Sequence, residues 1–368
     1  MRKSFKYRVY PTKAQAAKLD SWLDLCRELH NAALQERRDH WRGAGIGVGF
    51  NDQSRQLPAI KEERPEFADI YSQVLQQVLH RVDLAFKHFF RRIKNHETPG
   101  YPRFKSRDRY DSLTWPQAPG FALVGTKRLR LGNVGEVRIK LHRPIEGKPK
   151  TCAVKRETGK WYASFSCDDV PPRVYPDATA EVGIDMGLES FATLSTGEKV
   201  ENPRWYRKTE KRLADAQRRL SRKKRGSKRR AKAKRRLARL RANEKNQRND
   251  FHYKLAHRIV SENGVIIVED LKPKEMIERS STGLSKSIQD AAWSRFLAIL
   301  GAKAAEAARR FVKVPPRGTS STCSRCGAFK HKTLSERLHV CPCGLILDRD
   351  INASINILRL GRSLQAAS

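Results

Sequence analysis

The sequence predicts an amino-terminal antiparallel β-barrel with a helical bundle, followed by an α/β domain that contains a cysteine-rich element. Three observations lead to this prediction. Short alternating strands separated by Gly and Pro occupy residues 99–175. Apolar runs that end in acidic residues alternate with helical patterns from residue 181 to residue 368, and four cysteines cluster within residues 317–346. A chain of 368 residues is long enough for two or three such domains.

The first strand and the helical bundle precede most of the barrel. Residues 3–10 alternate as a strand, and a capping-box pattern that starts at Thr12 opens a helix that runs to about residue 41. After a glycine-rich break, a second strongly periodic helix covers about residues 70–93. We interpret residues 13–98 as a small helical unit. A helix-turn-helix motif is the alternative, but the connection is too long for its short turn.

The barrel is predicted to combine residues 1–12 with residues 99–175, because the first strand completes it. Cys152 and Cys167 lie in this segment and are interpreted as core thiols. The runs expected to form the other strands are 121–124, 128–131, 135–141, 151–156 and 160–167.

Aromatic residues near the start of the barrel segment are interleaved with Arg and Lys. They are Tyr101, Phe104, Tyr110 and Trp115. This pattern is typical of a nucleic-acid platform, on which bases stack against rings while cations pair with phosphates. Burial in the barrel core is the alternative, and for any single ring it is the interpretation that we favour.

The second half begins after a linker indicated by Pro171 and Pro172. Residues 272–285 are polar and rich in Ser and Gly, so we expect a mobile loop that gates entry of a nucleic-acid strand. The other elements expected are a β-hairpin at 181–187 and 190–196, a helical hairpin at 203–262, and a helix from about 288 to 311.

The charge of the chain indicates a polyanionic partner. Lys and Arg number 76 against 39 Asp and Glu, which gives a formal net charge of +37. A strongly apolar helix face, which membrane binding would need, is missing from the basic stretch 218–241. That stretch has no acidic partners of its own, so a phosphate-facing surface is favoured over a solvated charged helix. With no apolar leader and no spanning segment in the sequence, we expect a soluble, cytoplasmic protein.

Three acidic residues stand at the ends of separate motifs. Asp185 and Glu269 come where short apolar runs stop, which places both carboxylates at the carboxyl ends of buried strands. Asp350 precedes the start of an amphipathic helix. Asp270 competes with Glu269 for its role, and Asp348 competes with Asp350. Carboxylates gathered beside a polyanion need cations between them, and hard divalent ions held in this way can cleave a phosphodiester. The sequence therefore predicts a metal-dependent nuclease.

Four cysteines form two closely spaced pairs, Cys323 with Cys326 and Cys341 with Cys343, separated by fourteen residues. Four thiolates in two turns can surround one Zn²⁺ and leave no open position, so the predicted role is structural. The second pair has one intervening residue instead of two. The alternative fourth ligands are therefore two histidines, His331 and His339.

The order of these motifs closely resembles that of the TnpB family, the transposon-associated, RNA-guided nucleases related to type V CRISPR effectors. The resemblance rests on Gly183–Gly187 (Gly-Ile-Asp-Met-Gly), Ile267–Leu271 (Ile-Val-Glu-Asp-Leu), the cysteine pairs, and Asp348–Ser354 (Asp-Arg-Asp-Ile-Asn-Ala-Ser). Further matching segments are 7–12, 100–105, 285–293 and 317–323. The likeness covers nearly the whole chain and ends near Arg359.

This resemblance implies a split RuvC nuclease domain of RNase H-like fold, interrupted by the zinc element, and a wedge-like barrel with an inserted recognition unit. Asp185, Glu269 and Asp350 match the catalytic positions, with Asp185 expected to bridge two Mg²⁺ ions. Cys323, Cys326, Cys341 and Cys343 match the zinc positions. The expected partners are a guide noncoding RNA and double-stranded target DNA, with no membrane involved, and the sequence predicts no oligomeric state.

Two other functions fit part of this pattern. A DDE-type transposase is also metal-dependent and RNase H-like, but its third acid is normally Glu, whereas the order here is Asp, Glu, Asp. A non-catalytic nucleic-acid-binding regulator would not need all three acids.

Overall fold

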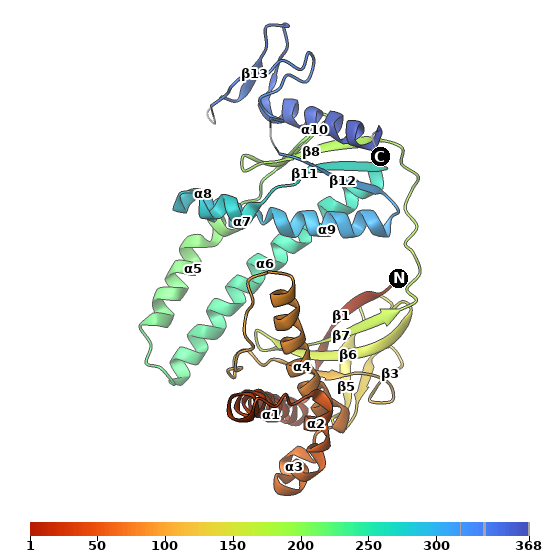
Figure 1. Cartoon of the computed structure of the whole chain (residues 1–368), viewed down its shortest axis with the longest axis vertical. Helices are drawn as coiled ribbons and strands as arrows, with labels where there is room; N and C mark the ends of the chain where they lie inside the picture. The colour runs from red at the N-terminus through yellow and green to blue at the C-terminus, as the bar shows by residue number, and fades with distance from the viewer. Residues whose placement is uncertain (317, 334–335, 367–368) are drawn as a thin grey trace. The chain divides into compact units, whose positions relative to one another are not determined.

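The computed structural model describes residues 1–316, 318–333 and 336–366 (Figure 1). The chain divides into two compact units, Met1–Pro171 and Pro172–Ser368. The boundary therefore falls between the two prolines that indicated a linker.

The amino-terminal unit contains one seven-stranded antiparallel sheet. Its strand order is β2-β6-β7-β1-β5-β4-β3, so the first strand lies in the middle, between β7 and β5. Among the described residues no pairing joins the edge strands β2 and β3, and closure into a barrel stays a prediction. The strands are β1 (Lys3–Tyr10), β2 (Ser112–Trp115), β3 (Phe121–Val124), β4 (Arg128–Leu131), β5 (Gly135–Lys140), β6 (Lys148–Glu157) and β7 (Lys160–Asp168).

The helices of this unit pack against its sheet in a single hydrophobic core. The capping box at Thr12 is confirmed, since its hydroxyl accepts from the Gln15 amide while Gln15 reaches back to the Thr12 backbone. Cys152 and Cys167 are fully buried, as core thiols should be. The separation of residues 13–98 from the barrel stays a prediction. The helices are α1 (Lys13–Ala44), α2 (Phe50–Arg55), α3 (Leu57–Glu63), η1 (Pro65–Phe67) and α4 (Ser72–Lys94).

The carboxyl-terminal unit is built on a mixed five-stranded sheet of order β10-β9-β8-β11-β12. Strand β9 runs antiparallel to both β8 and β10, and β11 and β12 run parallel to β8. The expected α/β architecture is thus present. The strands are β8 (Glu181–Met186), β9 (Ser190–Leu194), β10 (Lys199–Glu201), β11 (Val265–Glu269) and β12 (Arg310–Val314).

Helices cover both faces of this sheet (Figure 1). Alternate residues of β11 face opposite sides, as the pleat of a strand requires. Ile266 and Val268 belong to the core shared with α6 and α9, whereas Ile267 packs with Ile357 of α10. The helices are α5 (Trp205–Ser221), α6 (Lys228–Glu262), α7 (Pro273–Glu278), α8 (Thr282–Ala291), α9 (Trp293–Glu306) and α10 (Arg349–Ala366).

Two predictions in this unit were wrong. The expected mobile loop 272–285 is largely helical, because Pro273 occupies the first turn of α7, where proline is tolerated, and α8 begins at Thr282. The expected helix 288–311 is broken at Ala292, which has a left-handed backbone, and α9 ends at Glu306. The residues after it form β12, whose Arg-Phe-Val-Lys-Val alternation was hidden behind an alanine-rich run.

The cysteine-rich element lies between β12 and α10 and contains a two-stranded sheet of β13 (Leu338–Val340) and β14 (Ile346–Asp348). The predicted element 317–346 begins at Arg317, which lies outside the described residues, as do residues 334–335. Across the described parts of the chain, no helix is both long and apolar enough to cross a membrane.

Candidate active site and metal centre

Asp185 and Glu269 lie side by side at the carboxyl ends of β8 and β11. The two strands run parallel, with Gly183 paired to Ile267 and Ile184 paired to Val268. One residue further along this register, Asp185 is next to Glu269. Both side chains point to the sheet face opposite Val268, which is the face that α10 covers.

Helix α10 brings the third acid to the same face, because it packs directly on the strands. A Cβ at Gly183 would overlap the Ser354 carbonyl oxygen and lie 2.6 Å from the Leu358 amide nitrogen. A Cβ at Gly361 would lie 2.6 Å from the Ile267 side chain. Asp350 stands in the first turn of this helix, as its place before an amphipathic pattern predicted. Gly183, two residues before Asp185, therefore allows the close approach of α10 to β8.

The electrostatics show that the three acids interact. Although Asp185 keeps some contact with solvent, burial among protein atoms, followed by the negative charges of Glu269 and Asp350, raises its pKa to about 8. Burial also raises the pKa of Glu269, against a hydrogen bond that Thr319 donates to it. Arg349 lies 3.3 Å from the Asp350 carboxylate. A cluster of oxygen ligands whose charges oppose one another suits hard divalent cations.

The competing acids have other partners. Asp348 accepts the Asp350 and Ile351 amides, so it caps α10, and it also pairs with Lys199 at 2.7 Å. Asp270 is exposed and pairs with Lys313 at 2.9 Å. These contacts do not favour Asp348 over Asp350, or Asp270 over Glu269, as a metal ligand.

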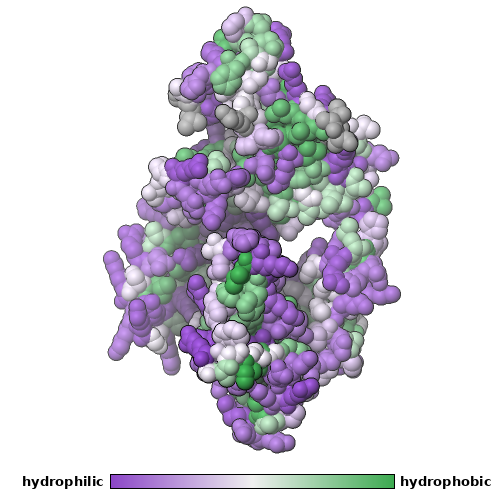
Figure 2. All heavy atoms as spheres, in the orientation of Figure 1, coloured by the Kyte–Doolittle hydropathy of each residue, from purple (hydrophilic) through white to green (hydrophobic). Residues whose placement is uncertain are grey.

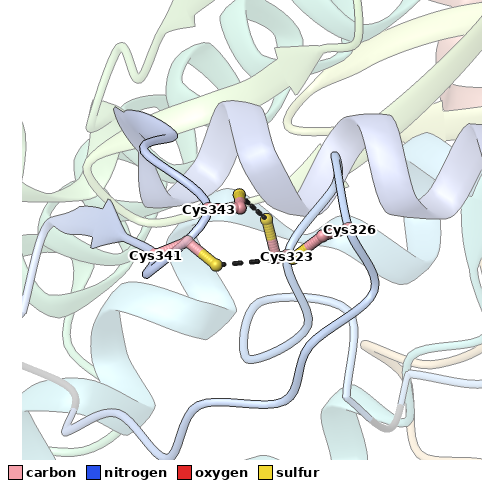
Figure 3. Close-up of side chains that lie close together, drawn as sticks. All are labelled: Cys323, Cys326, Cys341 and Cys343. Atoms are coloured by element: carbon pink, nitrogen blue, oxygen red, sulfur yellow. Dashed lines mark hydrogen bonds between the residues drawn. The ribbon is translucent and has the colours of Figure 1, made fainter.

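The four cysteines of the two pairs converge on one point (Figure 3). Cys323 Sγ lies 3.7 Å from Cys343 Sγ, Cys326 Sγ lies 3.5 Å from Cys341 Sγ, and all four sulfurs lie within 4.8 Å of one another. A tetrahedral Zn²⁺ with bonds of about 2.3 Å separates its sulfurs by about 3.8 Å. The short spacer of the second pair therefore does not keep its thiols apart, and neither histidine alternative belongs to this set.

The first cysteine turn also favours a thiolate. Burial penalises the charged form of Cys323, but the backbone amides of Cys326 and Arg325 favour it and bring the pKa of this thiol down to about 5.

Sequence reasoning missed the polar residues that connect the cysteine element to the acids. Asn352 and Asn356 are buried on one face of α10 and donate to backbone carbonyls of the turn that precedes Cys323. Thr319 belongs to that turn and donates to Glu269 Oε1. The available signal was the pair of asparagines four residues apart, a spacing that places both on one face of the helix.

The α5–α6 hairpin presents the densest positive charge. Its two helices pack through Leu213, Ala216 and Leu237, and Gly226 in the turn between them has a φ of +81°. Most of the Arg and Lys residues of 218–241 are exposed. Figure 2 shows hydrophilic side chains projecting along this hairpin.

A second candidate nucleic-acid surface lies in the amino-terminal unit. The four aromatic residues fall into two groups by burial. Tyr110 and Trp115 are buried, whereas Tyr101 and Phe104 are 47% and 45% exposed. The two exposed rings line a cavity of about 450 Å³ with several cationic side chains. Its cations are Arg81, Arg103, Lys105 and Arg109.

Comparison with known proteins places these features in one family. A protein of Streptomyces pristinaespiralis named "Putative RNA-guided DNA endonuclease" is 37% identical over 374 residues, which cover 100% of this chain and 91% of the relative. The Escherichia coli (strain K12) protein "Putative RNA-guided DNA endonuclease InsQ" is 30% identical over 99% of this chain and 93% of its own length. Both relatives therefore match almost the whole chain.

Three family descriptions match separate segments. "Probable transposase" matches residues 164–280, "Cas12f1-like, TNB domain" matches residues 293–357, and "Helix-turn-helix domain" matches residues 1–45. In the structure, residues 1–45 hold strand β1 and the single long helix α1. Among solved structures, the mini-RNA-guided endonuclease CRISPR-Cas_phi3 aligns over 98% of this chain and 92% of its own, with 10% identity and a TM-score of 0.48.

Proposed function

The chain belongs to the TnpB family, and from this premise we propose that it is an RNA-guided DNA endonuclease of a mobile element. The observation that carries the proposal is the placement of Asp185, Glu269 and Asp350 on one face of the mixed sheet. A guide noncoding RNA would select the double-stranded target by base pairing, so the protein would read only a short flanking motif and the shape of the duplexes.

The site is proposed to hold two Mg²⁺ ions, because its ligands are carboxylate oxygens. Asp185 would contact both ions, and Glu269 and Asp350 would each complete one site. When bound, such a pair activates a water molecule and stabilises the leaving 3′ oxygen of an in-line displacement. The protein contributes a rigid frame, since two strand ends and the first turn of α10 fix the carboxylates. The three carboxylates also make phosphate binding depend on the metal ions, because they repel a phosphate when no cation lies between them.

The architecture supports a RuvC-type nuclease of RNase H-like fold for this unit. Three antiparallel strands are followed by two strands parallel to the first, and α10 carries the last acid. The cysteine-rich element separates β12 from α10, which fits a split domain with an inserted module.

The four thiols are proposed to hold one structural Zn²⁺. Replacing Cys326 by Ser should reduce bound zinc from about one ion per chain to almost none and lower the melting temperature, since a structural zinc site contributes directly to folding. Elemental analysis and thermal unfolding would measure both effects. Cys152→Ala is the control, because its thiol is buried in the other unit and its loss should leave the zinc content unchanged. Full zinc content in the Cys326 variant would contradict the assignment.

The basic hairpin is proposed to bind RNA phosphates. Changing Arg222, Arg229, Arg235 and Arg239 to Gln should weaken RNA binding and reduce the magnitude of the slope of log K against log salt by up to about 3, at about 0.7 per phosphate contact. Filter binding across a salt series measures this slope. Lys254→Gln, on α6 outside the basic stretch and paired with Asp250, should leave it unchanged. An unaltered slope in the fourfold variant would mean that these arginines make no contact with RNA phosphates.

The proposed function is tested by expressing the protein in bacteria with its native flanking DNA and sequencing the RNA that co-purifies. A discrete species with a constant part and a variable part supports guided recognition and supplies the guide for a Mg²⁺-dependent cleavage assay. A mixture of unrelated cellular RNA would contradict it.

A transposase is the alternative suggested by the family description that matches residues 164–280. Cleavage without joining supports the nuclease, whereas strand-transfer products would favour the transposase. If a Glu269→Ala variant kept the full biological function of the wild-type protein, a non-catalytic nucleic-acid-binding regulator would be favoured instead.

A further inference from the structure

A continuous hydrogen-bond path joins the cysteine-rich element to the carboxylate site. The Thr319 hydroxyl donates to Glu269 Oε1 at 2.5 Å, and both residues are buried, with 5% and 6% of their surfaces exposed. Thr319 stands in the turn that leads to Cys323, four residues later. One side of this turn therefore faces the proposed catalytic carboxylate, and the other carries a proposed zinc ligand.

Helix α10 holds the turn in place through two asparagines. Asn356 Nδ2 donates to the carbonyls of Thr319 and Thr322 at 2.8 and 2.7 Å. Asn352 Nδ2 donates to the Thr322 carbonyl at 2.8 Å, and its Oδ1 accepts the Ser324 amide at 2.9 Å. Asn352 and Asn356 are almost fully buried, so breaking any of these bonds would leave polar groups without partners.

The turn has little freedom of its own to move. Ser321 and Thr322 both donate their amides to the Gly318 carbonyl, and Gly318 has a φ of +87°, which favours glycine. The same helix that carries Asp350 thus fixes the group that orients Glu269. Two of the three carboxylates are set by one rigid element.

We propose that Thr319 is a positioning residue for the carboxylate site, held in register by Asn352 and Asn356 of α10. Its hydrogen bond occupies Glu269 Oε1 and would leave Oε2 to hold the divalent cation. A hydrogen bond of this kind also limits the rotation of the long Glu side chain, which otherwise loses entropy when it binds a metal. The inference rests on the proposed two-metal site, and it adds that the cysteine turn sets the geometry of that site.

The test is the Mg²⁺ concentration needed for half-maximal thermal stabilisation of the zinc-loaded protein, which requires no catalysis. Thr319→Val keeps the shape and removes the hydroxyl, and it should raise this concentration by about 10- to 100-fold, as the loss of such outer contacts does. Thr319→Ser restores the hydroxyl and should return the value to within a few-fold of wild type. Zinc content should be unchanged in both variants.

One control and one further variant distinguish a positioning role of Thr319 from a purely structural role. Ser320→Ala removes the neighbouring hydroxyl of the same turn, which makes no hydrogen bond among the described residues, and should not shift the Mg²⁺ midpoint. Asn356→Ala should shift it in the same direction as Thr319→Val and also speed the release of zinc to a chelating dye.

The outcomes are distinct. A Thr319→Val protein that melts at a lower temperature but keeps the wild-type Mg²⁺ midpoint would overturn this inference and leave the proposed function standing. Absence of any Mg²⁺-dependent stabilisation in the wild-type protein would overturn the two-metal site itself, and this inference with it.

Discussion

Asp185→Asn is expected to abolish guided DNA cleavage, with a loss of rate of about a thousandfold or more and with unchanged affinity for RNA. Asp185 is the carboxylate that interacts with both other acids, so its loss removes a ligand shared by both proposed ions. Several kcal/mol of transition-state stabilisation depend on such ions, and each 1.4 kcal/mol is about tenfold in rate. Single-turnover cleavage by the ribonucleoprotein, at saturating Mg²⁺, measures the loss.

Asp270→Asn is the matched control for this substitution. Asp270 follows Glu269 directly and carries the same charge, yet it is exposed and paired with Lys313. Its replacement should change the cleavage rate by less than a few-fold. Residual cutting by Asp185→Asn at the level of the control would mean that the reaction takes place elsewhere.

The same Asn substitution should stabilise the metal-free protein at high pH. Because burial and the neighbouring acids raise the folded-state pKa of Asp185 to about 8, while the unfolded value is about 4, the folded protein holds this proton where the unfolded chain has lost it. Stability from this group is therefore complete below about pH 4 and declines as the pH rises toward 8, by at most about 1.4 kcal/mol per pH unit.

Thermal unfolding of the zinc-loaded protein without Mg²⁺ tests the sign of this effect. The Asp185→Asn variant should gain stability over wild type as the pH rises from 5 to 8. Added Mg²⁺ should stabilise the wild-type protein more than the variant and so narrow the difference. A difference independent of pH would show that the cluster is not electrostatically strained.

The places of both sets of candidate metal ligands in the fold could be predicted from the sequence because the signals are local. An apolar run that stops at an acid marks a strand end, and this gave Asp185 and Glu269 their correct positions on β8 and β11. The two cysteine turns are also recognisable locally, from the close spacing of the cysteines in each pair. The sequence does not separate Asp348 from Asp350, because helix capping and metal binding both use an acid near the start of α10. The structure adds that Asp348 caps this helix.

The missed features depend on contacts between distant segments. Strand β12 follows an alanine-rich helix and becomes recognisable only through its parallel pairing with β11. The roles of Thr319 and Asn356 arise from hydrogen bonds across 50 and 37 residues of sequence, which no periodicity encodes. The two exposed rings at Tyr101 and Phe104 could not be separated from buried Tyr110 and Trp115, because alternating patterns do not show which rings the core has room for.

Gly183→Ala should reduce cleavage by about 100-fold although it touches no proposed ligand. Its Cβ would overlap the Ser354 carbonyl oxygen of α10 and crowd the Leu358 amide, both of which are backbone atoms of a rigid helix. Relief of the overlap requires α10 to move away from β8, and Asp350 must move with it. A displacement of about 1 Å in a catalytic group can cost about 100-fold in rate.

Gly283→Ala is the matched control, since a Cβ at this helical glycine meets no atom within 4 Å. It should leave both cleavage and stability close to wild type. For Gly183→Ala, the decisive measurement is the Mg²⁺ midpoint of cleavage in protein that still unfolds cooperatively. A raised midpoint shows that the packing of α10 sets the distance between Asp350 and the two strand-end acids. Wild-type cleavage at the wild-type midpoint would mean that the strand and helix can separate without disturbing the carboxylates, and that Asp350 is not held by this contact.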